Sequence, residues 1–316
     1  MSGAPAAAVQ ELDQEAVSRL LPVRQSDAHK QTHGRLVVVA GSLDYLGAGL
    51  LTTLAAVRAG AGLVCLCVPA SLQGLVAGRV PEAITAGLAE SAPYEVDAAR
   101  ALVELVGQEG DALVIGPGLA ASTGTRELVS LVAQRAGWPV VLDAQALNVL
   151  AVTDRRWERC QLDAVLTPHP GEFARLDGAP VGGRDDERAS RAAAAAARWG
   201  QVVVLKGART VIASPTGQTS RAPFAEPVLA TAGTGDVLAG IIGALLAQGM
   251  APFDAACAGV WLHGMAAVDW RSRHGDAGLA ASDLPPLIPA MRRHLMATRA
   301  GVSEGRRETH APGDES

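Results

Sequence analysis

The sequence is poor in aromatic and charged residues, which make up 3% and 19% of its 316 positions, while 49% are hydrophobic. This composition excludes a disordered, collagen-like or coiled-coil chain and provides enough apolar material for a large core. The best uncharged apolar run, Val237 to Ala247, has 11 residues, whereas a membrane-spanning helix needs roughly 18 or more. We therefore expect a globular protein that makes no membrane contact.

Positive charge is also scarce. Twenty-seven basic residues are outnumbered by 32 acidic ones, which gives a net charge of −5, and the sequence has no block of basic residues of the kind that binds nucleic acid. The first residues contain no basic stretch followed by an apolar stretch, so no secretory leader is predicted. These absences favour a cytoplasmic protein with no nucleic-acid partner.

Cysteine and lysine are rare. Neither CxxC spacing nor a histidine at zinc-ligand spacing accompanies the four cysteines, which are therefore predicted to be buried reduced thiols: Cys65, Cys67, Cys160 and Cys257. Lysine occurs only at Lys30 and Lys206, because nearly all of the basic residues are arginine. Because lysine is so rare in this sequence, each of the two lysines is a candidate for a functional role.

Short β-branched runs alternate with stretches of helical periodicity. Strands are predicted at residues 35–40, 63–68, 112–115, 139–142, 164–167 and 202–205, and helices at 47–59, 123–135, 185–199, 234–248 and 252–270. Continuous apolar strands separated by helices indicate a parallel sheet buried on both faces. A hairpin is predicted at 210–213 and 219–221.

Domain boundaries are predicted only near the ends, because no linker-like segment interrupts the middle of the chain. We expect an N-terminal extension at 1–27, one α/β domain at 28–299 and a flexible tail at 300–316.

The strongest local motif is ATAGTGD, residues 230–236, which continues directly into an apolar helix. Small residues let a ligand approach the backbone, and the free N–H groups of a helix start attract anions. The same helix start favours a negative charge, so Asp236 is expected to stay ionised. From the local sequence alone, Asp236 is equally well a helix cap or a catalytic base.

Two further motifs follow predicted strands, where open α/β sheets bind ligands. In TPHPGEF, His169 lies between two prolines, which suits holding a substrate, although a solvated or structural role is also open; Glu172 could position magnesium or complement the helix dipole. In VVLKGART, Lys206 and the following glycine could bind a phosphate, although an exposed strand-edge lysine is the alternative.

Glycine-rich turns at 41–49 and 116–119 also follow strands, and neither is a Rossmann or P-loop motif. Each is weak alone, since a turn that needs positive φ explains it. Five such loops at strand ends of one chain together indicate a binding site.

These segments together resemble the ADP/ATP-dependent NAD(P)H-hydrate dehydratases of the ribokinase-like superfamily. The resemblance covers about residues 28–297 and is carried by GRLVVVAGS, YLGAGLLTTLAAVRAGAGLV, IGPGL, VVLDAQALNVL, VLTPHPGEFARL, VVLKGARTVIASPTG and ATAGTGDVLAGIIGALLAQG. It implies a three-layer α/β/α sandwich with a mostly parallel central sheet. It also implies a metabolite-repair lyase that dehydrates the S epimer of hydrated NADH or NADPH (NADHX, NADPHX), uses ADP or ATP with Mg²⁺, releases phosphate and forms a homotetramer.

The resemblance also assigns residues. The hydrate would contact Ala48, Gly118, His169 and Asp236, and Asp236 would be the catalytic base. The nucleotide would contact Lys206, Gly207, Ala208, Arg209, Thr210 and Gly235, with its phosphates on Gly233, Thr234 and Gly235. Glu172 is the candidate magnesium residue. Standalone members generally use ADP, which is the expected nucleotide here.

Two positions depart from the family pattern. Glu226 replaces the Asn of a GNP-like run, and Gln145 replaces the second Asp of a DADALN run. Many relatives also carry an N-terminal epimerase domain, and the residues before the first predicted strand leave no room for one. A separate NAD(P)HX epimerase is therefore expected in the same pathway.

Two other functions remain open. A kinase for a vitamin precursor, such as a hydroxymethylpyrimidine or hydroxyethylthiazole, would share the fold, but the TPHPGEF segment argues against it. A non-catalytic nucleotide-binding or regulatory protein would not need Asp236, Lys206 and His169 together.

Overall fold

One mostly parallel sheet organises the computed structural model, which describes residues 9–88, 112–135, 137–153 and 162–308. Within these ranges the strand order is β1-β10-β9-β8-β7-β6-β5-β2-β3-β4. The strands are β1 (Gln10–Glu11), β2 (Arg35–Val39), β3 (Leu63–Pro69), β4 (Ile84–Leu88), β5 (Ala112–Ile115), β6 (Val140–Leu142), β7 (Ala164–Leu166), β8 (Val202–Leu205), β9 (Val211–Ala213) and β10 (Thr219–Arg221). Only β9 pairs antiparallel to its neighbours β8 and β10, which confirms the predicted hairpin and the mostly parallel sheet.

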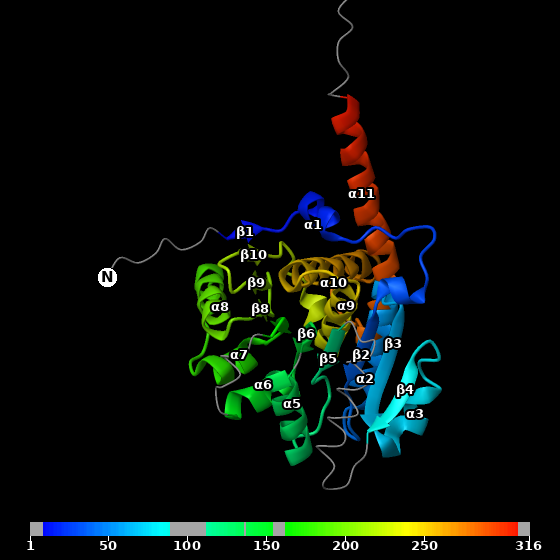
Figure 1. Cartoon of the computed structure of the whole chain (residues 1–316). Coiled ribbons are helices and arrows are strands. Elements are labelled where there is room, and N and C mark those ends of the chain that lie inside the picture. The colour runs from blue at the N-terminus through cyan, green and yellow to red at the C-terminus, as the bar shows by residue number, and fades with distance from the viewer. Residues whose placement is uncertain (1–8, 89–111, 136, 154–161, 309–316) are drawn as a thin grey trace, which may run out of the picture.

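Helices cover both faces of the sheet (Figure 1). One face packs against α2 (Leu46–Ala59), α3 (Gln73–Ala77), α9 (Thr234–Ala247) and α10 (Pro252–His274), and α1 (Gln14–Leu20) and α11 (Ile288–Glu308) pack onto the helices of this layer. The other packs against α5 (Thr123–Arg135), α6 (Gln145–Val152), α7 (Pro170–Asp177) and α8 (Asp185–Trp199). The predicted three-layer sandwich is therefore confirmed.

Strand β2 shows why both faces bury apolar residues. Leu36 and Val38 point into the core beneath α9, while Val37 and Val39 point into the core beneath α5 and α6. All four are fully buried, because successive side chains of a strand alternate between faces.

Helix α9 packs closely against both α2 and the sheet. A Cβ atom on Gly240 would lie 2.2 Å from the Thr52 carbonyl oxygen of α2, and one on Gly243 would lie 2.3 Å from a methyl group of Val114 in β5. These contacts leave no room for side chains, so α9 and the loop before it are held at one fixed distance from their neighbours.

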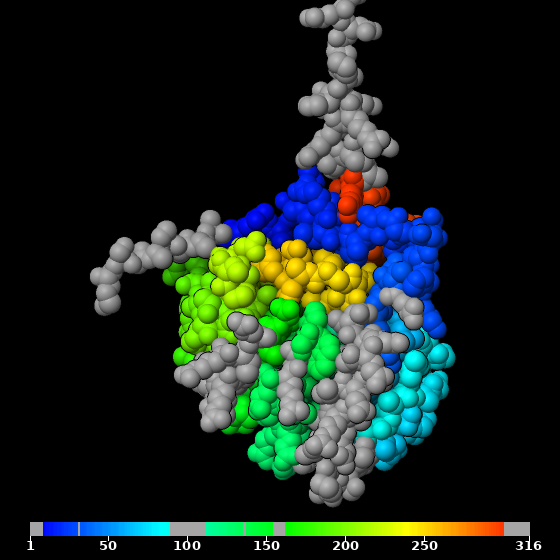
Figure 2. Space-filling view, in the orientation of Figure 1, coloured from blue at the N-terminus to red at the C-terminus, as the bar shows by residue number. Residues whose placement is uncertain are grey.

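The N-terminal segment packs onto this domain, whereas the C-terminal helix extends away from it (Figure 1). Strand β1 extends the sheet by pairing with β10, and α1 packs against α10 and α11. Figure 2 shows the N-terminal segment (blue) lying directly on α10 (orange). Helix α11 projects outward and continues to Glu308, within the segment predicted as a tail (Figure 1). The boundaries at 27 and 299 stay predictions.

Cys65, Cys67 and Cys257 are buried and unpaired, as predicted, and Cys160 lies outside the described residues. None of the helices in the described ranges has the length and apolar character needed to cross a membrane.

Candidate active site

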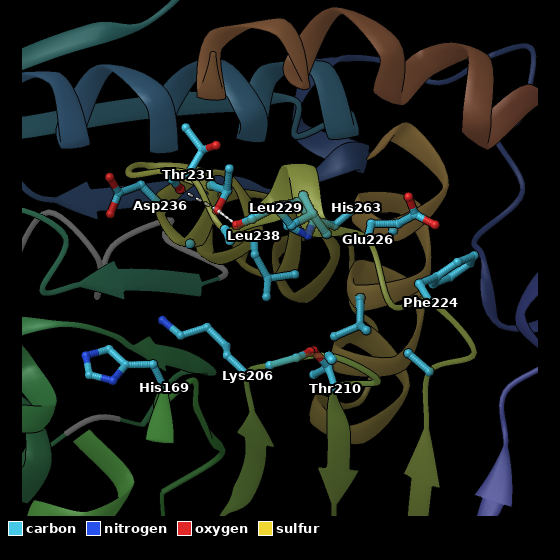
Figure 3. A pocket seen from close by; sticks show the side chains of 18 of the residues that line it. His169, Lys206, Thr210, Phe224, Glu226, Leu229, Thr231, Asp236, Leu238 and His263 are labelled. Carbon is cyan, nitrogen blue, oxygen red and sulfur yellow. Dashed lines mark hydrogen bonds between the residues drawn. The ribbon is translucent and has the colours of Figure 1, made fainter. Parts of the chain in front are cut away.

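A cavity of about 630 Å³ lies where β6, β7 and β8 end and α9 begins (Figure 3). Most of the residues predicted for the site line it, although they come from three segments of the chain: His169, Glu172, Lys206, Gly207, Ala208, Thr210, Gly233, Thr234, Gly235 and Asp236. The rule that parallel strands direct their following loops to one edge of the sheet thus placed these motifs together correctly.

The start of α9 forms an anion-binding corner of the cavity. Gly233 precedes the helix with φ of +89°, a left-handed conformation that suits glycine. The Thr234 hydroxyl lies 2.9 Å from the carbonyl oxygens of both Leu229 and Thr231, which fixes the loop. The Thr234 N–H donates to the Thr231 carbonyl oxygen at 3.4 Å, but no side chain caps the helix start, so the next N–H groups, of Gly235 and Asp236, can bind an anion.

Asp236 lies in the first turn of α9 and makes no capping hydrogen bond. The pKa of Asp236 is raised to about 7, first by burial and then by the neighbouring carboxylates of Asp143 and Glu172, against the lowering effect of Lys206. The expectation that Asp236 stays ionised is therefore wrong: near neutral pH it is partly protonated, because burial and like charges outweigh the helix dipole. A pKa near the working pH suits a general base.

Lys206 is the positive centre of this group of carboxylates. Its Nζ lies 2.8 Å from Asp143 Oδ1 and 3.9 Å from Glu172 Oε2. Burial alone would lower the pKa of Lys206, but Asp143, Glu172 and Asp236 together raise it, so the ammonium stays charged. A Cβ on Gly235 would lie 3.3 Å from the same Nζ, which places the ammonium beside the start of α9. The alternative of an exposed strand-edge lysine does not hold.

Asp143 is a functional candidate that the sequence analysis did not select. Its side chain is almost fully buried and accepts a hydrogen bond of 2.6 Å from the Thr167 hydroxyl. The next residue, Ala144, has φ of +48°, a strained conformation for a residue other than glycine. Asp143 directly follows β6, so its place after a strand was the available signal.

His169 and Glu172 stabilise the start of α7. His169 Nδ1 accepts hydrogen bonds from the N–H groups of Gly171 and Glu172, at 3.0 and 3.3 Å. The Glu172 carboxylate accepts a hydrogen bond of 2.8 Å from the His169 N–H, which completes a capping box. Nδ1 is thus used structurally, and Nε2 lies 3.5 Å from Glu172 Oε1, while half of the His169 side chain is exposed at the cavity, where a ligand can contact it.

Three predicted site residues lie outside the cavity. The Arg209 guanidinium turns toward the N-terminal strand, where it contacts Glu11 at 2.6 Å. Ala48 and Gly118 contact each other instead: a Cβ on Gly118 would lie 2.6 Å from that of Ala48. They remain near the site, because Leu51, one turn further along α2, packs against Gly233.

The end of the cavity away from Asp236 contains residues that the sequence analysis did not assign to the site. Phe224 and Glu226 line this end, and the buried His263 lies between them and the start of α9 (Figure 3). Burial lowers the pKa of His263 to about 4, so its ring is neutral. A histidine within an apolar helix gave little signal, since most such residues are structural.

Comparison with known proteins supports this picture. A sequence profile described as NAD(P)H-hydrate dehydratase matches residues 36–290. The chain is 40% identical over 279 residues to the ADP-dependent (S)-NAD(P)H-hydrate dehydratase of Neisseria meningitidis, a match that covers 86% of this chain and 89% of the relative. It is 42% identical over 277 residues to the bifunctional NAD(P)H-hydrate repair enzyme Nnr of Moorella thermoacetica, which covers 87% of this chain and 52% of the relative.

Among solved structures, the ADP/ATP-dependent NAD(P)H-hydrate dehydratase of Bacillus subtilis co-crystallised with ATP/Mg²⁺ aligns with a TM-score of 0.79 and 34% identity, covering 91% of this chain and 99% of that one. The fold is that of the ribokinase-like superfamily. The chain belongs to the NAD(P)H-hydrate dehydratase family, as its motifs predict. It spans about half the length of the first bifunctional relatives that it matches.

Proposed function

We propose that the protein dehydrates the S epimer of NADHX or NADPHX to NADH or NADPH, with ADP as the expected co-substrate and release of phosphate. The observation that carries the proposal is the Asp236 carboxyl, which lies in the first turn of α9 within the charge field of Lys206 and has its pKa raised to about 7. The test is release of inorganic phosphate that depends on the S epimer of NADHX, compared with ADP and with ATP.

The chemistry follows from the leaving group. A hydroxyl on the reduced nicotinamide ring leaves poorly, so it first attacks the terminal phosphoryl group of the nucleotide, which breaks that group's bond to the remaining nucleotide. Asp236 takes the hydroxyl proton, while Lys206 and the first N–H groups of α9 stabilise the phosphoryl charge. The ring nitrogen then expels phosphate, and loss of a proton from the adjacent ring carbon restores the dihydropyridine.

Magnesium is proposed as part of the bound nucleotide. Within the described ranges no group of three or more acidic, cysteine or histidine side chains forms a metal cage. Mg²⁺ commonly needs only one or two carboxylates besides nucleotide phosphates, so Glu172 with Asp143 nearby fits such an ion. The ion would neutralise phosphate charge when bound.

The nucleotide contacts proposed for Lys206, Gly207, Ala208, Thr210 and Gly235 are supported by their places in the cavity wall. Arg209 is proposed to hold the nucleotide loop in place through its backbone N–H and its ion pairs. Its N–H donates to the Phe224 carbonyl oxygen at 2.8 Å, which connects the two loops of the cavity.

Ala48 and Gly118 are proposed to meet the hydrate at the edge of the site. We also propose a homotetramer in the cytoplasm that acts with a separate epimerase. The bifunctional relatives support pairing with an epimerase activity, and the three buried free thiols support a reducing compartment.

Activity is expected to rise with pH through about 7, because only the ionised Asp236 can accept the hydroxyl proton and its pKa is raised to about 7. Below that midpoint, kcat/KM should fall by about tenfold per pH unit. Bound nucleotide adds negative charge, so the midpoint in kcat should lie higher than that in kcat/KM. The measurement is phosphate release between pH 5.5 and 9, and a flat profile across this range would exclude Asp236 as the base.

Replacing His169 tests its proposed contact with the hydrate. His169→Ala should raise the KM for the hydrate more than that for ADP, and loss of the cap on α7 should cost about 0.5–2 kcal/mol of stability. His169→Asn keeps an acceptor for the cap and should restore stability but not hydrate affinity. Recovery of hydrate affinity in the Asn variant would show that His169 is only a helix cap.

A further inference from the structure

The cavity has two chemically different ends. Lys206 and the free N–H groups of α9 favour phosphate at one end. At the other end Phe224 and Glu226 lie close together (Figure 3). A nucleotide whose phosphates occupy the first end therefore extends its nucleoside toward Phe224 and Glu226.

The Phe224 ring is held by α10. A Cβ on Gly264 would lie 2.2 Å from Phe224 Cδ2, so the absence of a side chain there lets the ring lie against the helix. Trp261 meets the ring edge-on, with the ring centroids 4.9 Å apart. Both contacts fix the ring, whose remaining surface forms part of the cavity wall and offers an apolar platform for a base.

Glu226 places a carboxylate next to this ring. Its side chain is only 8% exposed, and its Oε2 lies 2.6 Å from Nε of the more exposed Arg271. A carboxylate has about four acceptor sites and no donor, and one arginine does not use them all. Negative phosphates are disfavoured beside it, so the ligand group that fits there is a neutral hydrogen-bond donor.

We propose that Glu226 accepts a hydrogen bond from a ribose hydroxyl of the nucleotide and thereby selects ribonucleotides over deoxyribonucleotides. The inference rests on the proposed function for the identity of the nucleotide. Acidic side chains bind ribose hydroxyls in other nucleotide sites. Arg271 keeps the carboxylate ionised and oriented, and Phe224 packs against the base.

The test is binding measured by calorimetry in the absence of hydrate. Wild-type protein should bind ADP at least about tenfold more tightly than 2′-deoxy-ADP or 3′-deoxy-ADP, the scale of one hydrogen bond to a charged acceptor. Glu226→Ala should weaken ADP binding by a similar factor and bring the ratio close to one, and Glu226→Gln should give an intermediate ratio. Glu15→Ala, which removes an acid paired only with Arg19 on the surface of α1, should leave every affinity unchanged.

Three results would overturn the proposal. Equal weakening of ADP and both deoxy nucleotides in Glu226→Ala, matched by Arg271→Met, would make Glu226 only a structural partner of Arg271. A wild-type protein that binds all three equally tightly would exclude a hydroxyl contact. IDP lacks the amino group of adenine. If Glu226→Ala lost the preference for ADP over IDP but kept the preference for ADP over the deoxy nucleotides, the Glu226 contact would belong to that amino group.

The two proposals fail separately. If the wild-type protein prefers ADP to deoxy nucleotides but releases no phosphate with the hydrate, the proposed function fails and the role of Glu226 stands. If the wild-type protein turns over the hydrate but binds ADP and the deoxy nucleotides equally well, the proposed function stands and the role of Glu226 fails. Melting temperatures of both Glu226 variants, measured in the same preparations, identify any loss of binding caused by unfolding.

Discussion

Asp236→Asn is expected to reduce kcat by 10²–10⁴-fold, the usual effect of losing a general base. Asn has nearly the same size but cannot accept the hydroxyl proton. Nucleotide affinity should stay the same or increase, because a negative charge leaves a site that already holds Asp143 and Glu172. Lys206 and the N–H groups of α9 remain in place to bind the phosphates.

The same variant should be more stable than the wild type at high pH. The pKa of Asp236 is raised from its ordinary value of 3.8 to about 7, so the folded state holds a proton that the unfolded chain has released. Stability contributed by this group is therefore lost as pH rises from about 4 to about 7. The Asn variant avoids that loss, and its melting temperature should exceed that of the wild type most clearly above pH 7.

The test is to measure kcat, ADP affinity and melting temperature as a function of pH for the wild type and Asp236→Asn. A variant that keeps more than about a tenth of the wild-type kcat would fall well short of the expected 10²–10⁴-fold loss and would contradict the assignment of the base. In that case Asp143, whose buried carboxylate lies 2.8 Å from Lys206 Nζ, would be the next residue to test.

Lys206→Met is expected to affect both binding and folding. Without the ammonium, Asp143 loses a partner at 2.8 Å, and Glu172 and Asp236 lose the positive charge near them. Breaking a buried ion pair typically costs about 3–5 kcal/mol. Nucleotide affinity should fall by about tenfold or more, since a charge-assisted contact to phosphate contributes about 1.5–3 kcal/mol.

A further expected result distinguishes this role from simple destabilisation. Lys206 lowers the pKa of Asp236, so its removal should move the pH midpoint of activity upward from about 7. Lys30→Met is the matched control, because Lys30 is the other lysine and is exposed in the 3₁₀ helix Lys30–His33. Unchanged ADP affinity in a folded Lys206→Met variant would exclude Lys206 from the phosphate site.

The sequence allowed prediction of the buried strands and the hairpin, because each of these has a recognisable pattern within a few residues. Continuous apolar runs gave β2, β3, β5, β6, β7 and β8, and the sequence around Pro215-Thr216-Gly217 gave the β9–β10 hairpin. Strand β1 could not be predicted, because its two residues are exposed and become a strand only by pairing with β10. Strand β4 lies at the sheet edge and contains no fully buried residue, so it gave too weak a signal.

The candidate site was also predictable from the sequence only in part. Motifs after strands located Lys206, His169 and Asp236 in one cavity, since topology alone brings strand ends together. The pKa of Asp236 could not be predicted, because it depends on burial and on Asp143 and Glu172, which are distant in sequence. The outward course of Arg209 was equally hidden, since its partner Glu11 belongs to the N-terminal strand.

The close packing of α9 limits how this protein can diverge in evolution. Side chains cannot be added at Gly240 or Gly243 without displacing α2 or β5, and such a displacement would also move Asp236 on the same helix. New substrate preferences are therefore expected to arise by substitutions in the loops around the cavity, such as the segment that carries Phe224 and Glu226. A mutational scan read out as folding stability should find the inner face of α9 nearly invariant and that loop comparatively permissive.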